Sequence, residues 1–169
     1  MIPAVLMSLA MSAPTAGEYV TAQSGLNMRA GPSLDAAVIR VVPFAEEVHG
    51  SIQDGWMQTD DGFFLSAEYL SEDDPLDGWT HMGQWHLTAY YATGNATASG
   101  VYPEVSNTIA HNTLPFGTQV YIKGHGIWTV HDRGPASMGT QWCDLYLGDY
   151  GTCVQFGSQY ADVWVKEKP

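Results

Sequence analysis

The chain has 169 residues and a formal net charge of −12, with 45% hydrophobic and 14% charged residues. This length and composition indicate a folded protein of one domain or two small ones, and they exclude an intrinsically disordered chain. An acidic surface repels phosphate backbones and anionic lipid heads, so nucleic acid and membrane surfaces are excluded as expected partners.

The composition favours β-structure over helices. Eighteen glycines, nine prolines, six tryptophans, nine tyrosines and five phenylalanines are typical of short strands joined by turns. Leucine-rich periodic segments, which amphipathic helices require, are nearly absent from the sequence. The sequence therefore predicts an all-β protein.

The chain begins with sixteen apolar and small residues, MIPAVLMSLAMSAPTA. They are too short to cross a bilayer, so we expect no membrane span. They fit the hydrophobic region of an export signal, although the basic residues that usually precede such a region are missing. We therefore predict that residues 1–16 are a signal-like or disordered N-terminus and that the protein is extracellular. A wrongly placed start codon, or a phage-encoded protein without a signal, explains the same residues.

Residues 17–71 consist of short alternating segments broken by turn residues, the pattern of a small barrel of five strands. Three motifs, LNMRAGPS (Leu26–Ser33), the pair Gly55 and Trp56, and AEYL (Ala67–Leu70), resemble those of bacterial SH3-like domains. The resemblance implies a domain that tethers a cell-wall enzyme to the peptide stems or cross-bridges of peptidoglycan. Core packing is the alternative explanation for the aromatic residues Trp56, Phe63, Phe64 and Tyr69.

An acidic linker is predicted at residues 72–84, because SEDDPLDG (Ser71–Gly78) combines four acids with Pro and Gly. Residues 85–169 then return to strand patterns. LTAYYA alternates, TQVYIKG and GIWTVHD flank a short turn as a hairpin, and ADVWVKE lies near the end. Only Gly148–Phe156 has room for a helical turn or two. These segments predict a second compact β-barrel.

Asp144 is the first candidate for chemistry. If WCDLYL is a strand, alternation places Trp142, Asp144 and Tyr146 on one face and the Cys and Leu side chains on the other. A carboxylate between two aromatic rings suits a glycan site, because the rings can stack on sugars while the acid acts on the bond between them. Apolar neighbours would also raise the pKa of Asp144. The alternative is an edge-strand Asp that bonds a neighbouring backbone amide.

Three further candidates lie nearby in the sequence, and each has a simpler explanation. Asp132 follows the strand segment IWTVH at a Gly-Pro turn, where an Asp can also cap the turn. Arg133 could contact an anionic group, or it could be a solvated surface residue. His111, in AHNTLPFGT, could line the site, or it could do no more than hydrogen-bond a turn.

Four motifs in order, TASG (Thr97–Gly100), TIAHNTLPFGTQVYI, VHDRGP and CDLYL, resemble those of a double-psi β-barrel. Such barrels are shared by rare lipoprotein A-like proteins and by the three-aspartate domain of membrane-bound lytic transglycosylase A and its Gram-positive relatives. The resemblance covers residues 87–165. The expected fold is therefore all-β, with a small SH3-like barrel followed by a six-stranded double-psi β-barrel.

The two branches of this resemblance imply different site residues. In the three-aspartate pattern, Asp144 is the catalytic acid, Asp132 is a second catalytic aspartate, and Asn112 stands where the first aspartate falls. In the rare lipoprotein pattern, His111 and Asp132 act with a glutamate, and this chain has Val101 in its place.

The resemblance implies a peptidoglycan lytic transglycosylase. Such an enzyme cleaves the β-1,4 bond between N-acetylmuramic acid and N-acetylglucosamine and leaves a 1,6-anhydro product. We expect a cell-wall-associated monomer that acts on peptidoglycan without a cofactor. The candidate substrate-binding residues are His111, Asn112, Arg133, Trp142, Tyr146, Thr97 and Ser99.

A protein that binds glycan without cleaving it, in the manner of the related expansins, is the alternative function. Asn112 favours this alternative, because an amide cannot ionise. The absent glutamate favours it as well, since the nearest acid, Glu104, lies three residues after Val101.

The two cysteines cannot make a four-thiolate zinc site. In an exported protein Cys143 and Cys153 would pair as a disulfide, and in a cytoplasmic protein they would be two thiols. A metal site formed by His111, His125, His131 and a carboxylate is a third reading of the site, and we expect no metal there.

Overall fold

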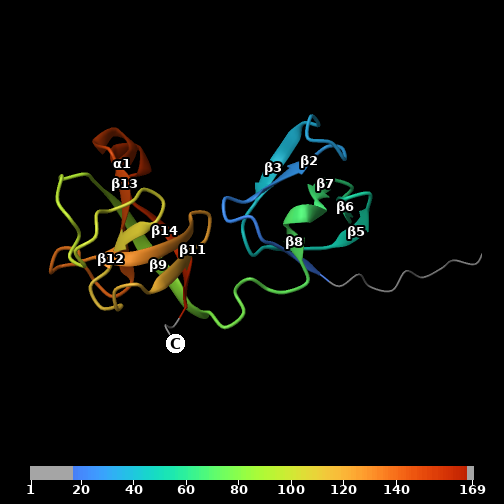
Figure 1. Ribbon diagram of the computed structural model, residues 1–169. Coiled ribbons are helices and arrows are strands. Elements are labelled where there is room, and N and C mark those ends of the chain that lie inside the picture. The colour runs from blue at the N-terminus through green and yellow to red at the C-terminus, as the bar shows by residue number, and fades with distance from the viewer. Residues whose placement is uncertain (1–16, 167–169) are drawn as a thin grey trace, which may run out of the picture.

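The computed structural model describes residues 17–166, which form the two lobes in Figure 1. The predicted N-terminal signal at residues 1–16 lies outside the described residues. The fold is all-β, as predicted. No helix within residues 17–166 is long and apolar enough to cross a membrane.

The first lobe, called here the small-sheet unit, contains eight short strands. They are β1 (Glu18–Val20), β2 (Leu26–Arg29), β3 (Val38–Val42), β4 (Glu47–Val48), β5 (Gly50–Gln53), β6 (Trp56–Thr59), β7 (Phe64–Ser66) and β8 (Leu70–Ser71), with a 3-10 turn at Ala67–Tyr69. They form a five-stranded sheet in the order β3-β2-β7-β6-β5 and a three-stranded sheet in the order β4-β1-β8.

Local sequence explains why these strands are short and numerous. Asp54 and Gly55 both have positive φ and join Gln53 to its partner Trp56, as the tightest hairpin turn requires. Gly50 runs against β6, where an added Cβ would clash with the carbonyl oxygen of Gln58. The sequence predicts five strands in this segment, and the structure has eight. The apolar faces of the two sheets enclose one core, formed by Val20, Leu26, Met28, Val42, Val48, Met57 and Leu65.

The second lobe is a closed six-stranded barrel, which confirms that part of the predicted fold. Its strands are β9 (Thr80–Tyr91), β10 (Thr108–Ala110), β11 (Gln119–Ile122), β12 (Gly126–Asp132), β13 (Trp142–Gly148) and β14 (Gln159–Lys166). They close in the order β10-β12-β11-β14-β9-β13. The pairs β10–β12 and β13–β9 are parallel, and the others are antiparallel.

The barrel encloses a core that is separate from the core of the small-sheet unit. It includes Trp85, Leu87, Val120, Trp128 and Leu145. The predicted hairpin is β11–β12, with Ile122 opposite Gly126. The predicted helical turns are α1 (Tyr150–Phe156), capped by the Asp149 side chain.

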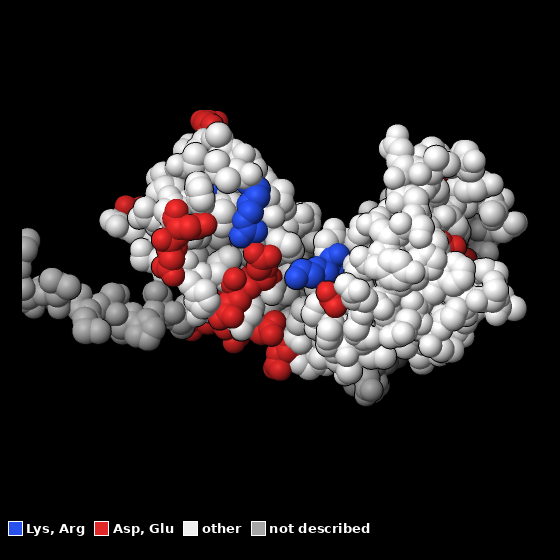
Figure 2. All heavy atoms as spheres, turned by 180° about the vertical axis from the view of Figure 1, so that it is seen from behind, with Lys and Arg blue, Asp and Glu red and all other residues white. Residues whose placement is uncertain are grey.

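The barrel begins earlier than expected from sequence. Residues 80–84 were assigned to the linker, but they are the first part of β9, where they pair with Asp162, Trp164 and Val165 of β14. The rest of the acidic stretch, residues 72–78, remains between β8 and β9. Figure 2 shows acidic side chains gathered on the small-sheet unit and where the lobes meet, whereas the visible face of the barrel is almost free of charge.

The two cysteines are free thiols, so the predicted disulfide is absent. Cys143 belongs to the barrel core, whereas Cys153 lies on α1 outside that cluster. Burial raises the pKa of the Cys143 thiol, which keeps it protonated and unreactive.

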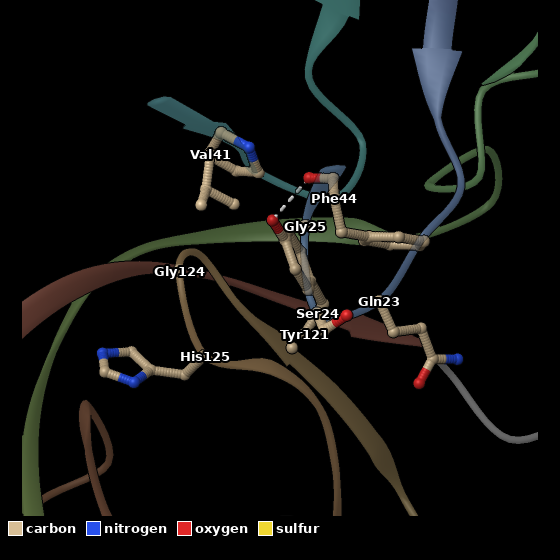
Figure 3. Close-up of a pocket in the computed structure, with 10 residues that line it drawn as sticks. Gln23, Ser24, Gly25, Val41, Phe44, Tyr121, Gly124 and His125 are labelled. Atoms are coloured by element: carbon tan, nitrogen blue, oxygen red, sulfur yellow. Dashed lines mark hydrogen bonds between the residues drawn. The ribbon is translucent and has the colours of Figure 1, made fainter. Parts of the chain in front are cut away.

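A buried aromatic pair joins the small-sheet unit to the barrel. The Tyr121 hydroxyl donates to the carbonyl oxygen of Phe44 at 2.7 Å, and the ring centroids are 5.2 Å apart. Beside this contact lies a cavity of about 300 Å³, lined among others by Gln23, Gly25 and His125 (Figure 3). The pair therefore fixes the β11–β12 hairpin against the loop that follows β3.

Replacing Tyr121 with Phe should weaken this contact. The buried carbonyl of Phe44 would lose its donor, so we expect the free energy of unfolding to fall by about 1–2 kcal/mol. In a thermal melt this corresponds to roughly 2–4 °C per kcal/mol for a chain of this size. Tyr160→Phe is the matched control, because Tyr160 is 69% exposed. Identical melting temperatures for the two variants would show that the bond contributes nothing.

Candidate functional site

The candidate acids lie in one row across four neighbouring strands. Asp132 of β12 and Asp144 of β13 are both in register with Ala110 of β10, and Thr88 of β9 is in register with Asp144. The neighbouring residues Cys143 and Leu145 are buried in the barrel core. The row therefore lies on the outer face of the barrel, which confirms the predicted alternation along β13.

A register shift brings Asp132 into this row. Ile109 pairs with Val130, but the next residue, Ala110, pairs with Asp132, so the pairing skips His131. Without the shift, Asp132 would share the inward face of Val130, which is buried in the core. Irregularities of this kind re-aim side chains, and they are frequent beside active sites.

Asp144 is a half-buried acid with one hydroxyl partner. Asp144 accepts a hydrogen bond from Thr88 Oγ1 at 2.8 Å. Thr88 Oγ1 in turn accepts a hydrogen bond from Trp142 Nε1 at 2.8 Å. Burial raises the pKa of Asp144, the Thr88 bond opposes this rise, and the nearby charge of Asp132 adds to it. The pKa shift has the predicted direction, so Asp144 keeps its proton to higher pH than an exposed Asp does.

Asp132 is held by three donors. Its Oδ1 accepts from the backbone amides of Ala98 at 2.9 Å and Arg133 at 2.8 Å, and its Oδ2 accepts from the Tyr90 hydroxyl at 3.2 Å. Burial and the charge of Asp132 raise the pKa of Tyr90, so its hydroxyl stays a donor. The carboxylate of Asp132 is therefore fixed in the same row as Asp144, on the other side of β10, and it also caps the turn after β12.

The TASG segment supports Asp132 rather than presenting free hydroxyls. Thr97 is buried, and its Oγ1 donates to the carbonyl of Val101 at 2.8 Å and lies 3.0 Å from Ser99 Oγ. The backbone amide of Ser99 donates to the carbonyl of His131 at 3.1 Å. These bonds favour a structural role for Thr97 and Ser99 over the predicted substrate contacts.

His111 is a buried structural residue, which argues against the predicted role in substrate binding. It is 1% exposed. Its Nδ1 accepts from the amides of Thr113 and Leu114, so Nε2 carries the proton toward the carbonyl of Thr140, 3.0 Å away. Burial lowers the pKa of His111. With both nitrogens occupied, His111 organises its turn, as the simpler explanation predicted.

Asn112 and Arg133 brace the loop after β12. The Asn112 side chain donates to the carbonyl of Pro135 at 2.9 Å and accepts from the amide of Gly134 at 3.0 Å. Arg133 Nη1 donates to the carbonyl of His111 at 2.6 Å, and its guanidinium lies 3.8 Å from the centroid of the Phe116 ring. The polar atoms of Asn112 and Arg133 are thus used in hydrogen bonds within the loops. This favours a structural role for both residues over the predicted substrate contacts.

The predicted aromatic neighbours of Asp144 differ in accessibility. Trp142 is half-buried, whereas Tyr146 is only 8% exposed and packs 5.3 Å from the ring of Tyr90. Tyr146 therefore forms a wall of the site, and Trp142 is the more open of the two.

Thr88 and Tyr90 were missed by sequence reasoning, although both bond the candidate acids. A signal was present, since alternation in LTAYYA places them on one face. The sequence does not predict that β9 pairs in parallel with β13. This pairing places that face of β9 beside Asp144.

The small-sheet unit offers a second candidate surface around Trp56. This side chain lines two cavities, one of about 390 Å³ with Pro32 and Phe64, and another of about 270 Å³ with Arg29 and Tyr69. Met57 and Leu65 fill the core instead. The aromatic residues Trp56, Phe64 and Tyr69 are thus partly open to solvent, whereas Phe63 packs against the core.

Comparison with known proteins gives no assignment: the chain matches no family model and no curated protein. Within residues 17–166, no group of three or more His, Cys, Asp or Glu side chains lies close enough together to hold a metal ion.

Proposed function

We propose that the protein is a peptidoglycan lytic transglycosylase that cleaves the bond between N-acetylmuramic acid and N-acetylglucosamine. The observation that carries the proposal is the placement of two carboxylates in one row, on the two strands that flank β10, with the pKa of Asp144 raised by burial and by Asp132. The sequence motifs add a resemblance to the three-aspartate double-psi barrel, in which the residue at this position is the acid.

Asp144 would serve in both steps of the reaction. In its protonated form it donates to the leaving oxygen, while positive charge develops at C1 of the muramyl sugar. The resulting carboxylate then takes the proton of the C6 hydroxyl, which attacks C1 and closes the 1,6-anhydro ring without consuming water. Proton transfer of this kind contributes about 10²–10⁴-fold. One acid suffices, unlike the two-carboxylate design of most glycosidases.

Asp132 would stabilise the positive charge at C1. Its carboxylate is held by the amides of Ala98 and Arg133 and by the Tyr90 hydroxyl, so it needs little rearrangement as the charge develops. Its negative charge also raises the pKa of Asp144. The same residue therefore supports both the acid and the transition state.

The small-sheet unit would tether the enzyme. An SH3-like domain is what its sequence motifs resemble, and the open aromatic residues around Trp56 would contact peptide stems. This function requires the protein to act outside the cell, at the wall.

The product profile of digested sacculi tests the proposal. Purified protein is incubated with peptidoglycan, and the soluble fragments are identified by mass spectrometry. Fragments ending in 1,6-anhydro-muramic acid are the expected result. Reducing ends without the anhydro ring would instead indicate a hydrolase, and this result would contradict the mechanism.

Non-catalytic glycan binding is the second candidate, and one observation favours it. Where the rare lipoprotein pattern has a glutamate, Val101 is 43% exposed, and the nearby Glu104 bonds the Asn107 side chain at 3.1 Å instead of reaching Asp132. Retention on insoluble peptidoglycan without released fragments would identify a binding protein.

Activity should fall as pH rises through the pKa of Asp144, because the proton donor is lost. The raised pKa of Asp144 also determines how the stability of the fold changes with pH. A carboxyl whose pKa is raised on folding stabilises the fold below its unfolded pKa, and this contribution is lost as pH rises through the folded pKa. We therefore expect kcat/KM to fall and the melting temperature to decrease over the same pH range above the ordinary Asp value. A pH–rate profile that is flat across this range would contradict the role of Asp144.

A further inference from the structure

We propose that Tyr160 and His86 form a sugar-binding subsite beside Asp144, which rests on the glycan-cleaving function proposed above. The subsite would stack on one N-acetylated hexosamine of the β-1,4-linked strand. Neither residue belongs to the motifs from which that function was inferred.

Three aromatic side chains lie in a row next to the row of acids. Tyr160 of β14 pairs with His86 of β9, and His86 pairs with Trp142 of β13. The ring centroids are 5.2 Å apart for Tyr160 and His86, and 4.9 Å apart for His86 and Trp142. We call these three residues the aromatic row.

The aromatic row lies two positions along the strands from the row of acids, as Trp142 and Asp144 on β13 show. His86 precedes Thr88 by two positions on β9, so the two side chains share a face and lie about 6.6 Å apart along the strand. Thr88 in turn bonds Asp144. A glycan whose scissile bond lies at Asp144 would therefore place a neighbouring ring over the aromatic row.

Among the described residues, the side of Asp144 that carries the aromatic row is more open than the side that carries Tyr90 and Tyr146. On the other side, Tyr146 is 8% exposed and Tyr90 bonds Asp132, so that pair is committed to the fold. Tyr160, by contrast, is 69% exposed. His86 Nε2 lies 2.7 Å from Ser158 Oγ, which fixes the ring before any ligand arrives. His86 stacks on one face of the Tyr160 ring and so supports it, which leaves the opposite face of Tyr160 for the sugar. A ring held in this way binds with little loss of side-chain freedom.

Binding measurements in an Asp144→Asn background test the subsite, because that variant would not consume its ligand. The probes are chitohexaose and glycan strands freed of peptide stems. Removal of one stacking ring should weaken affinity by about fivefold, so we expect this loss for Tyr160→Ala and no loss for Tyr160→Phe. The matched control is Tyr150→Ala, since Tyr150 is 66% exposed but lies on α1.

Kinetics separate the subsite from a purely structural role. With Asp144 intact, Tyr160→Ala should raise KM about fivefold and leave kcat and the melting temperature unchanged. Equal affinities of Tyr160→Ala and Tyr150→Ala, with anhydro products still formed by the wild type, would overturn the subsite alone. If the wild type forms no anhydro products and the Asp144→Asn protein binds neither probe, both the subsite and the proposed function are wrong.

Discussion

Replacing Asp144 with Asn should lower the rate of anhydro-end formation by about 10²–10⁴-fold. Asn keeps the shape of the side chain and can still accept the hydrogen bond from Thr88, but it cannot transfer a proton. The measurement is the yield of 1,6-anhydro muropeptides from sacculi over time.

The fold should survive this change. Because burial raises the pKa of Asp144, the ionised carboxylate is held in an unfavourable place at neutral pH, and Asn removes that cost. The variant should therefore melt at the same temperature as the wild type or above it at pH 7. Glu104→Gln is the matched control, since the carboxylate of Glu104 bonds Asn107, and its activity should be unchanged. Full activity of the Asp144→Asn protein would show that another group is the acid.

Replacing Asp132 with Ala should reduce both stability and activity. The amides of Ala98 and Arg133 and the Tyr90 hydroxyl would lose their acceptor. The Arg133 amide and the Tyr90 hydroxyl are partly buried, and a buried group left without a partner costs about 1–3 kcal/mol, whereas the exposed Ala98 amide can bond water instead. Chemical denaturation measures the loss of stability, and the muropeptide assay measures the loss of activity.

Asp132→Asn separates the charge of this residue from its hydrogen bonds. An amide oxygen can still accept from the two backbone amides, so most of the stability should remain. The negative charge that raises the pKa of Asp144 would be gone, so the decline of activity with rising pH should move to lower pH. An unchanged pH profile would show that the two carboxylates do not interact.

The face on which Asp144 lies could be predicted, but the way Asp132 joins it could not. Strict alternation along β13 is sufficient for Asp144, because Cys143 and Leu145 fill the core. On β12 the same rule would place Asp132 inward with Trp128 and Val130, and the register shift at His131 reverses this. Such a shift depends on pairing with β10, a contact that local sequence does not specify.

The roles of the polar residues were the hardest to predict. His111, Asn112 and Arg133 have the side chains of a binding site, yet each bonds the backbone of its own loops. Residue type cannot distinguish these cases, since a buried polar group must be satisfied whether it serves structure or function. Conversely, the residue types of Thr88 and Tyr90 did not mark them as site residues. They became candidates only through the parallel pairing of β9 with β13.

The contact between Tyr121 and Phe44 has a consequence for how the protein would work on a polymer. Going round the barrel, β11 and β14 lie opposite β13 and β10, so the small-sheet unit docks through Tyr121 on the far side from Asp144. A wall polymer held by the small-sheet unit would then approach the barrel from the side away from Asp144, so the proposed tether and the proposed cut would act on opposite sides of the barrel.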